Sequence, residues 1–540
     1  MAPSHEAAVT QISAAVRAFF TRRESFRVFH GSTNSTRPGH TGRVVDISAL
    51  SNVLEIDQTS KTAVVEPNVP MDKLVQATLA HGLIPPVVME FPGITVGGGF
   101  AGSAGESSSY KYGYFDQTVK GVEVVLASGE VVKASATEKP DLFKAAAGTA
   151  GTLGITTKLE LGLIPACRFV KLAYHPYSSV RETVEAVKRE TENPENHYVD
   201  GILFSKTHGV VMTGKLTDEI PPSQKPQTFS GSWDPWFYLH AEKKSLQSRT
   251  SDPTVDHIPI AEYLFRYDRG GFWVGAEAFK YFGNMIPFNK FTRWFLDDFM
   301  HTRMLYRALQ GSDMSFGTMV QDLSLPYDTA EAFIDYTDEQ LGIWPLWLCP
   351  LRGVSPPTFH PFHQSEEGKP QPMLNIGLWG AASKDLSTFI NQNRDLEARL
   401  KELGGRKVLY SHTYYTEDEF WALYDKKWYD GLRESYSATT LPSIYDKVHV
   451  DVDKVQNEQK ERLGRSWISW LMTCWPFPGI MGIRNAIRSG DYLIHRQPSW
   501  TYWKMGSLLT AQKVDGKKVV PVTATTTTTA TATRVEIGGS

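Results

Sequence analysis

The chain has 540 residues and a mass of 60.4 kDa, more than one hydrophobic core usually organises, so a single small domain is excluded. An apolar content of 41%, a charged content of 21% and a net charge of -3 are those of a globular protein without a general attraction for nucleic acid. Three widely spaced cysteines argue against a disulfide-stapled scaffold and predict a reducing compartment. No group of His, Cys and acidic residues has the spacing of metal ligands, so no metal site is predicted.

The amino-terminal part predicts a domain of mixed strands and helices. Two short β-branched runs fall within residues 44–67, and an amphipathic helix follows over 72–82 and ends at a glycine. A hairpin turns at 128–129, and a short helix, a glycine turn and a long strand follow over 141–165. We expect the first domain to occupy residues 1–165.

The next part of the chain twice shows a strand–helix–strand order. Its expected elements are a strand at 171–174, a helix at 177–190, a strand pair turning at 207–209, a strand at 373–380, a helix at 385–405, a strand at 406–415 and a helix at 417–434. Two such units predict one split antiparallel sheet that covers the first domain. The expected fold class is therefore α+β, with a cap (substrate) domain over residues 166–455. The aromatic-rich stretch 224–341 is a candidate wall for an apolar ligand.

The carboxyl-terminal part changes in character. The segment 466–483 has three tryptophans and no charge, and arginines flank it, which indicates an interfacial membrane segment; an apolar arm packed on the body is the alternative. We assign residues 456–505 to this Trp-rich arm. The Thr-rich tail 506–540 has low complexity, so it is expected to be disordered.

Three glycine-rich segments indicate an anion-binding and cofactor-binding site. HGSTNSTRP (residues 30–38) offers successive small residues whose backbone N–H groups can converge on a phosphate. Residues 91–113 contain seven glycines, and residues 148–157 (GTAGTLGITT) repeat the chemistry before a strand. Neither a GxGxxG fingerprint opening a βαβ unit nor a GxxxxGK[ST] loop is present, which disfavours the Rossmann and P-loop folds.

The order of these segments resembles the PCMH-type FAD-binding domain of the vanillyl-alcohol-oxidase family, with a phosphate loop, EPNVPMDKL, P-x-x-T-x-GG and G-T-x-G. The stretch TVGGGFAGSAGESSSYKYGYF is similar in particular to the delta(24)-sterol reductases, and their flavin-binding signature falls on residues 95–107 here. FRYDRGGFW, VQDLSLP, WPLWLCP and LYSHTYYTEDEFW extend the likeness over residues 25–450. The resemblance implies an FAD-binding domain of two subdomains and a cap that holds the substrate.

The glycine segments and the resemblance together place a set of residues at the FAD. They are His30, Gly31, Ser32, Thr33, Asn34, Ser35, Arg37, Thr95, Val96, Gly97, Gly98, Gly99, Phe100, Ala101, Gly102, Ser103, Ala104, Gly105, Glu106, Ser107, Gly151, Gly154 and Ile155. Members that bond the flavin covalently carry a histidine in the first loop where Asn34 stands here, so we expect noncovalent FAD, with His30 as the alternative anchor. Glu106 is expected either to bind the ribityl hydroxyls or to hold its own glycine turn.

The resemblance implies that NADPH reduces the FAD and that hydride then passes to the C24=C25 double bond of a sterol side chain. An isolated alkene is a poor hydride acceptor, so a proton donor must act with the flavin. Tyr112, Tyr410 and Tyr414 are the candidate donors, the last two on the predicted strand at 406–415; simple packing is the alternative for each.

Two other functions stay open on the sequence alone. One is a flavin oxidase or dehydrogenase of a specialised metabolite, because one fold supports many reactions. The other is a flavin-binding, membrane-associated interaction protein without catalysis. Residues 1–20 predict neither a signal peptide nor a spanning helix, so the arm at 466–483 is the candidate membrane contact. The expected location is the cytosolic face of the endoplasmic reticulum membrane, with the cytoplasm as the alternative.

Overall fold

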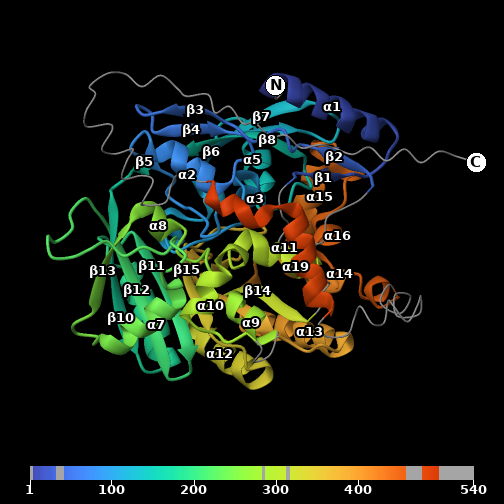
Figure 1. Cartoon of the computed structure of the whole chain (residues 1–540). Helices are drawn as coiled ribbons and strands as arrows, with labels where there is room; N and C mark the ends of the chain where they lie inside the picture. Colours follow the sequence, from blue (N-terminus) through green and yellow to red (C-terminus); the bar gives the residue numbers. More distant parts are fainter. Residues whose placement is uncertain (1–3, 32–41, 282–285, 312–316, 458–476, 498–540) are drawn as a thin grey trace, which may run out of the picture. The chain divides into compact units, whose positions relative to one another are not determined.

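The computed structural model describes five stretches of the chain (Figure 1). They are residues 4–31, 42–281, 286–311, 317–457 and 477–497. The predicted phosphate-loop residues 32–37, most of the Trp-rich segment and the whole Thr-rich tail lie outside these described residues.

The first layer is an antiparallel sheet with the order β3-β4-β8-β6-β7. Its strands are β3 (Val53–Asp57), β4 (Thr62–Val65), β8 (Ile155–Gly162), β6 (Val119–Val125) and β7 (Val131–Ser135). Buried and less buried residues alternate along β8, as expected where one face of a strand packs on a core. Helix α1 (His5–Thr21) is tied to this sheet, because His5 Nε2 lies 3.0 Å from Glu123 Oε1 on β6.

Short elements join this sheet to the glycine-rich segments. They are β1 (Arg27–Phe29), β2 (Val44–Asp46), α2 (Met71–Leu79), β5 (Leu83–Ile84), α3 (Val96–Ala101), α4 (Ser109–Tyr112), η1 (Phe115–Thr118), α5 (Pro140–Ala146) and β9 (Ile164–Pro165). Strands β1 and β2 pair in parallel, and β5 pairs with β9.

The second layer is a larger sheet with the order β13-β10-β12-β11-β15-β18-β14-β19, antiparallel at every pair. Its strands are β13 (Thr254–Pro259), β10 (Phe169–Tyr177), β12 (His208–Thr217), β11 (Tyr198–Ser205), β15 (Leu346–Leu351), β18 (Met373–Ala381), β14 (Thr318–Leu325) and β19 (Arg406–Lys407). The central strands β15 and β18 are buried on both faces, so their sequences are continuous apolar runs rather than alternating ones.

Helices α6 (Val180–Thr191), α12 (Tyr327–Leu341) and α13 (Leu386–Glu402) pack together on this sheet. They share a core of buried aliphatic residues with β11, β14 and β18. Each Val, Leu or Ile that is fully buried there contributes about 1.5–3 kcal/mol. Helix α6, predicted over 177–190, starts at Val180, because the Ser179 hydroxyl accepts a hydrogen bond from the Glu182 amide at 3.2 Å and caps it.

The remaining elements are short, and α7 to α11 lie in the aromatic-rich stretch 224–341. They are α7 (Phe237–Gln247), α8 (Ile260–Leu264), α9 (Val274–Tyr281), α10 (Lys290–Phe295), η3 (Asp297–Phe299), α11 (Thr302–Gly311), β16 (His363–Gln364), β17 (Pro370–Gln371), α14 (Glu417–Trp421), α15 (Lys426–Ser435), η4 (Ala438–Thr440), α16 (Ile444–Val448), α19 (Phe477–Ser489) and η5 (Asp491–Arg496). Helix α19 packs on α11.

The predicted α+β class with antiparallel sheets is confirmed, whereas two predicted elements are wrong in extent. The strand expected at 406–415 joins the large sheet only at Arg406 and Lys407, because the buried Lys407 ammonium bonds Glu397 on α13 and the chain beyond it leaves the sheet. The helix expected at 417–434 is two helices, α14 and α15, with Asp425 capping the second. The division into subdomains and the domain boundaries stay predictions.

Candidate functional site

A cavity of about 720 Å³ lies where the glycine-rich segments meet the larger sheet. Its walls come from the end of β1, from residues 93–105 and 148–156, and from α11, β14, β15 and β18. Sites for small molecules and cofactors usually have this size, and they are mostly apolar with a few polar groups. The cavity is therefore the candidate active site.

The central glycine segment forms one side of the cavity with its backbone. The Thr95 hydroxyl accepts a hydrogen bond from the Gly98 amide at 3.1 Å and so starts α3. A Cβ atom on Gly97 would lie 2.7 Å from Pro67 Cβ and 3.0 Å from the Pro67 carbonyl oxygen, and one on Gly105 would lie 2.7 Å from Leu351 Cδ2. Only glycine fits at these positions without a shift of the neighbours, so bare backbone can face a ligand there.

The third glycine segment turns the chain into β8 at the same cavity. Gly151 and Gly154 have φ values of +72° and +153°, and both line the cavity with Ile155. A Cβ atom on Gly154 would lie 2.8 Å from the carbonyl oxygen of Val125. The left-handed backbone and this close approach explain why glycine stands at position 154.

Most of the described cofactor residues that the sequence predicts do line this cavity. They are His30, Gly31, Thr95, Gly97, Gly98, Gly99, Ala101, Gly102, Ser103, Ala104, Gly105, Gly151, Gly154 and Ile155. Val96, Phe100, Glu106 and Ser107 are buried but are not part of its wall. The predicted Ser32, Thr33, Asn34, Ser35 and Arg37 lie outside the described residues.

Glu106 belongs to a buried ion-pair network rather than to the cavity wall. Its Oε1 atom lies 3.4 Å from Arg266 Nη1, and Arg266 Nη2 lies 2.9 Å from Asp200 Oδ2 on β11. The Glu106 carboxylate also accepts hydrogen bonds from Ser107 Oγ and the Ser108 amide. This network connects the flavin-signature sequence to the large sheet and fixes the position of one relative to the other.

Of the three predicted proton donors, only Tyr410 reaches the cavity. Tyr112 ends α4 and is not part of the cavity wall. Tyr414 is buried next to Phe389, with ring centroids 6.4 Å apart, and its amide binds Glu397. The difference arises because residues 408–415 form a loop, so the two tyrosines do not share one strand face.

Tyr410 takes part in a polar cluster that the sequence did not reveal. Its hydroxyl donates a hydrogen bond to Asp322 of β14 and interacts with Trp379 of β18. Asn375 Nδ2 donates to Asp322 Oδ1 at 2.7 Å. Burial raises the pKa of Asp322 to about 6, although the two hydrogen bonds act in the opposite direction. Burial and the neighbouring Asp322 also hold the pKa of Tyr410 well above its usual value.

Glu90 and Tyr306 add two more titratable groups to the cavity wall. Burial, with a further contribution from Glu106, raises the pKa of Glu90 well above the usual range, which favours the protonated form of its carboxyl group. Burial likewise raises the pKa of Tyr306. The Tyr306 hydroxyl, and the carboxyl group of Glu90 in its protonated form, are therefore further hydrogen-bond donors in this wall.

Aromatic side chains form the apolar wall of the cavity. Phe272, Trp347 and Trp379 line it and contact each other, with ring centroids 4.4 Å apart for Phe272 and Trp379 and 5.3 Å apart for Phe272 and Trp347. Tyr267 stacks behind Phe272 at 3.9 Å. A rigid wall of this kind suits a large apolar ligand and keeps water out.

Comparison with known proteins agrees with the geometry. The model of the FAD binding domain family matches residues 3–135, which include the first two glycine segments. Delta(24)-sterol reductases of Macaca fascicularis, Homo sapiens and Mus musculus are each 30% identical over 405 residues, covering 74% of this chain and 76% of the relative. The chain belongs to the delta(24)-sterol reductase family. Because it also has the FAD-binding domain, the protein is an FAD-dependent oxidoreductase.

The described residues fit an FAD group. The backbone at Gly97 and Gly105 is bare and packed from behind, and Gly154 approaches the β6 backbone closely. The wall of the same cavity also contains Asp322 and Tyr410, two side chains that can carry a proton. Among the described residues, no helix has both the length and the apolar character needed to cross a bilayer.

Proposed function

We propose that the protein reduces the C24=C25 double bond of a sterol side chain, with NADPH as the electron donor and noncovalent FAD as the cofactor. The observation that carries the proposal is the position of Tyr410 and Asp322 in the same cavity as the glycine segments and the aromatic wall. The names of the relatives, delta(24)-sterol reductases, support a sterol as the substrate class.

The reaction adds a hydride and a proton across the alkene. FAD, when bound and reduced by NADPH, supplies the hydride. The chain must then supply the proton to the other carbon, and it must do so in a site that excludes water. Phe272, Trp347 and Trp379 provide the dry surface, and Tyr410 lies in the same wall.

In this proposal Tyr410 donates the proton and Asp322 restores it. The phenol of Tyr410 is hydrogen-bonded to Asp322, and Asn375 holds the carboxyl group from the other side. Because the pKa of Asp322 is raised to about 6 by burial, this carboxyl group takes up and releases a proton near neutral pH. Tyr410 can therefore remain neutral through the turnover, while Asp322 exchanges its proton with the surroundings.

The test is an anaerobic spectrum of the purified, FAD-loaded protein. NADPH is expected to bleach the flavin, and a delta(24)-unsaturated sterol such as desmosterol is expected to restore its colour as the saturated sterol appears. If NADPH leaves the spectrum unchanged and an added alcohol drives oxygen consumption, the protein is an oxidase on the same fold and the reductase proposal is wrong.

A pair of tyrosine variants isolates the proton donor. Tyr410→Phe keeps the ring but removes the acid, so the sterol-dependent reoxidation is expected to slow by about 10²–10⁴-fold, while bleaching by NADPH stays unchanged. Tyr414→Phe is the matched control, because Tyr414 is buried outside the cavity. Equal rates in wild type and Tyr410→Phe would rule out Tyr410 as the donor.

Noncovalent binding of the flavin has a direct test. Acid precipitation should release all the FAD into the supernatant, because Asn34 replaces the histidine that anchors the flavin in covalent members. Flavin that stays with the precipitate would point to His30, which lines the cavity.

We also propose that the carboxyl-terminal arm touches the cytosolic face of the endoplasmic reticulum membrane. Ile480, Ile483 and Ile487 recur at helical spacing on α19 and are exposed, so they form an apolar stripe beside α11. Flotation with neutral phospholipid vesicles tests this contact. The wild type should float, and a variant with Ile480, Ile483 and Ile487 all changed to Ser should stay in the dense fraction.

A further inference from the structure

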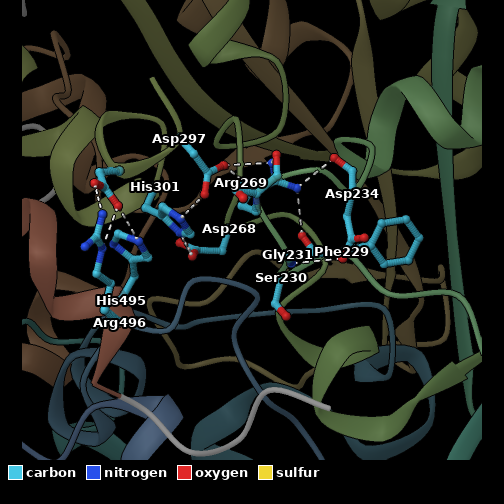
Figure 2. A network of polar contacts seen from close by, with 12 residues as sticks. Phe229, Ser230, Gly231, Asp234, Asp268, Arg269, Asp297, His301, His495 and Arg496 are labelled. Carbon is cyan, nitrogen blue, oxygen red and sulfur yellow. Dashed lines mark hydrogen bonds and ion pairs between the residues drawn. The ribbon is translucent and has the colours of Figure 1, made fainter. Parts of the chain in front are cut away.

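Outside the cavity, two histidines and several carboxylates meet between α11 and the carboxyl-terminal arm (Figure 2). Asp268 precedes α9, Asp297 lies in η3, His301 directly precedes α11, and His495 lies in η5. One ligand atom each from Asp297, His301 and His495 lies within 4.8 Å of the others. The sequence shows no ligand spacing because His495 comes from a distant part of the chain.

Both imidazoles are held by a carboxylate through one ring nitrogen. His301 Nδ1 lies 2.6 Å from Asp268 Oδ2, and His495 Nε2 lies 3.0 Å from Asp298 Oδ1. Figure 2 shows His301 and His495 side by side, with Asp268 next to His301, and the two rings stack with centroids 3.8 Å apart. A carboxylate behind each ring is the arrangement that orients metal-binding histidines and raises their basicity.

The opposite nitrogen of each ring has no hydrogen-bond partner. His301 is only 6% exposed, and its Nε2 atom is buried without a partner, as is Nδ1 of His495. Asp297 Oδ2 lies 3.6 Å from His301 Nε2, too far for a hydrogen bond. A buried nitrogen left without a partner carries a desolvation penalty of about 1–3 kcal/mol, which a bound ion would remove.

Asp297 keeps one oxygen available for such an ion. Its Oδ1 atom binds Arg269, with Nε at 2.8 Å and Nη2 at 2.7 Å, whereas Oδ2 is the atom nearest to His301. Two imidazole nitrogens and one carboxylate oxygen form the donor set that Zn²⁺ prefers, with a water molecule completing the tetrahedron.

We infer that Asp297, His301 and His495 form a binding site for a divalent transition-metal ion of the Zn²⁺ class. Ligand atoms about 2.1 Å from a tetrahedral ion are about 3.4 Å apart, so the donors must approach each other by up to roughly 1.5 Å. His495 is the ligand that moves, because η5 is a short element whose residues 492–496 are half-buried or exposed, whereas Asp297 and His301 are buried.

The ion would fasten the arm to the wall of the cavity. His301 directly precedes α11, and Thr302, Arg303 and Tyr306 of that helix line the cavity. Arg496, the neighbour of His495, already binds Asp298 with Nε at 3.0 Å. A metal ion at this place would therefore add a second link from η5 to η3, and through His301 a link to the start of α11.

A proton is the competitor for the same nitrogen. Burial alone would lower the pKa of His301, but Asp268 and Asp297 together raise it to about 9. Metal binding must displace that proton, so the binding experiment belongs at mildly alkaline pH.

The test titrates the full-length, FAD-loaded protein, first stripped with a chelator, with Co²⁺ at pH 8.5. We expect one equivalent of Co²⁺ to give a ligand-field band at longer wavelength than the flavin absorption, and Zn²⁺ to abolish this band. His495→Gln keeps a hydrogen-bond donor toward Asp298 but lacks the ligand nitrogen. It should weaken binding by more than about 100-fold, beyond the 10–100-fold expected for Asp298→Asn, which only changes the support of the ligand.

His81→Gln is the matched control, because His81 is an exposed histidine far from η5 in sequence, and its Co²⁺ titration should equal that of the wild type. The inference is overturned if Co²⁺ gives no ligand-field band, or if the band survives unchanged in His495→Gln. Since the variant alters a peripheral element, its fold is checked by flavin content and far-ultraviolet circular dichroism. Binding is read without any turnover, so the result is independent of the proposed reductase activity.

Discussion

Arg266 Nη2 and Asp200 Oδ2 lie 2.9 Å apart, with both side chains at 1% exposure or less. Tyr267 Oη and Trp347 Nε1 donate to the same oxygen at 2.9 and 3.2 Å. Arg266 also reaches Glu106 in the flavin-signature sequence. One carboxylate on β11 thus organises the arginine, the aromatic wall and the segment that precedes α4.

Removal of this carboxylate charge is expected to be strongly destabilising. Asp200→Asn leaves Arg266 with a buried and poorly compensated charge, so the free energy of unfolding should fall by about 3–5 kcal/mol. Urea unfolding of the FAD-loaded protein measures it. The exposed pair Lys206 and Asp335, 2.7 Å apart, is the control, and Asp335→Asn should change stability by less than about 1 kcal/mol. Equal effects of the two variants would contradict a special role of the buried network.

Gly154 permits a test of the third glycine segment. Gly154→Ala places a Cβ atom 2.8 Å from the Val125 carbonyl oxygen at a φ of +153°, so the turn at the cavity must distort. We expect the free energy of unfolding to fall by at least about 1–3 kcal/mol, together with a lower FAD content after purification. Gly121→Ala in the same sheet meets nothing closer than 3.6 Å and should retain full flavin occupancy. Normal occupancy in Gly154→Ala would show that this turn does not shape the cofactor site.

The sequence predicts the sheets well where the side-chain pattern is local. The hairpin at 128–129 and the long strand within residues 141–165 follow from β-branched runs and glycine turns, and both are present, the strand as β8. The strand expected at 406–415 fails for a non-local reason. The Lys407 side chain is 1% exposed and forms an ion pair with Glu397. The pattern of residues 406–415 alone does not predict this partner.

The same distinction holds for the site. Glycine segments are readable because backbone approach to a ligand requires them in one stretch of sequence. Asp322, Asn375 and Tyr410 come from three separate segments, and only the antiparallel pairing of β14 with β18 brings the first two together. The sequence did offer one signal for such site residues, a single charged residue within an apolar run. Glu90 stands in VVMEFP in this way, and Asp322 in MVQDLSL.

Lys407 makes the non-local contact testable. Its ammonium binds Glu397 at 2.5 Å, and Glu397 also accepts the Tyr414 amide at 3.0 Å. Lys407→Met leaves the buried Glu397 carboxylate without its cation, so the free energy of unfolding is expected to fall by about 3–5 kcal/mol. Adding Glu397→Gln should recover a large part of that loss, because the uncompensated charge is gone. Denaturant midpoints of the single and double variants decide this, and an additive double variant would contradict a direct coupling.

Asp322 gives the pH dependence of the proposed reaction. Burial raises its pKa to about 6, and the protonated form is the one that can restore the proton on Tyr410. Sterol-dependent reoxidation of the reduced flavin should therefore be constant below about pH 6 and fall about tenfold per pH unit above it. Asp322→Asn keeps the shape and a hydrogen-bond acceptor but cannot titrate, so its rate should be lower and flat across this range. Stopped-flow reoxidation between pH 5 and 8 measures both profiles, with the exposed Asp335→Asn expected to follow the wild type. An unchanged inflection in Asp322→Asn would assign the titration to another group, and Glu90 in the same wall, whose pKa burial also raises, is the first to examine.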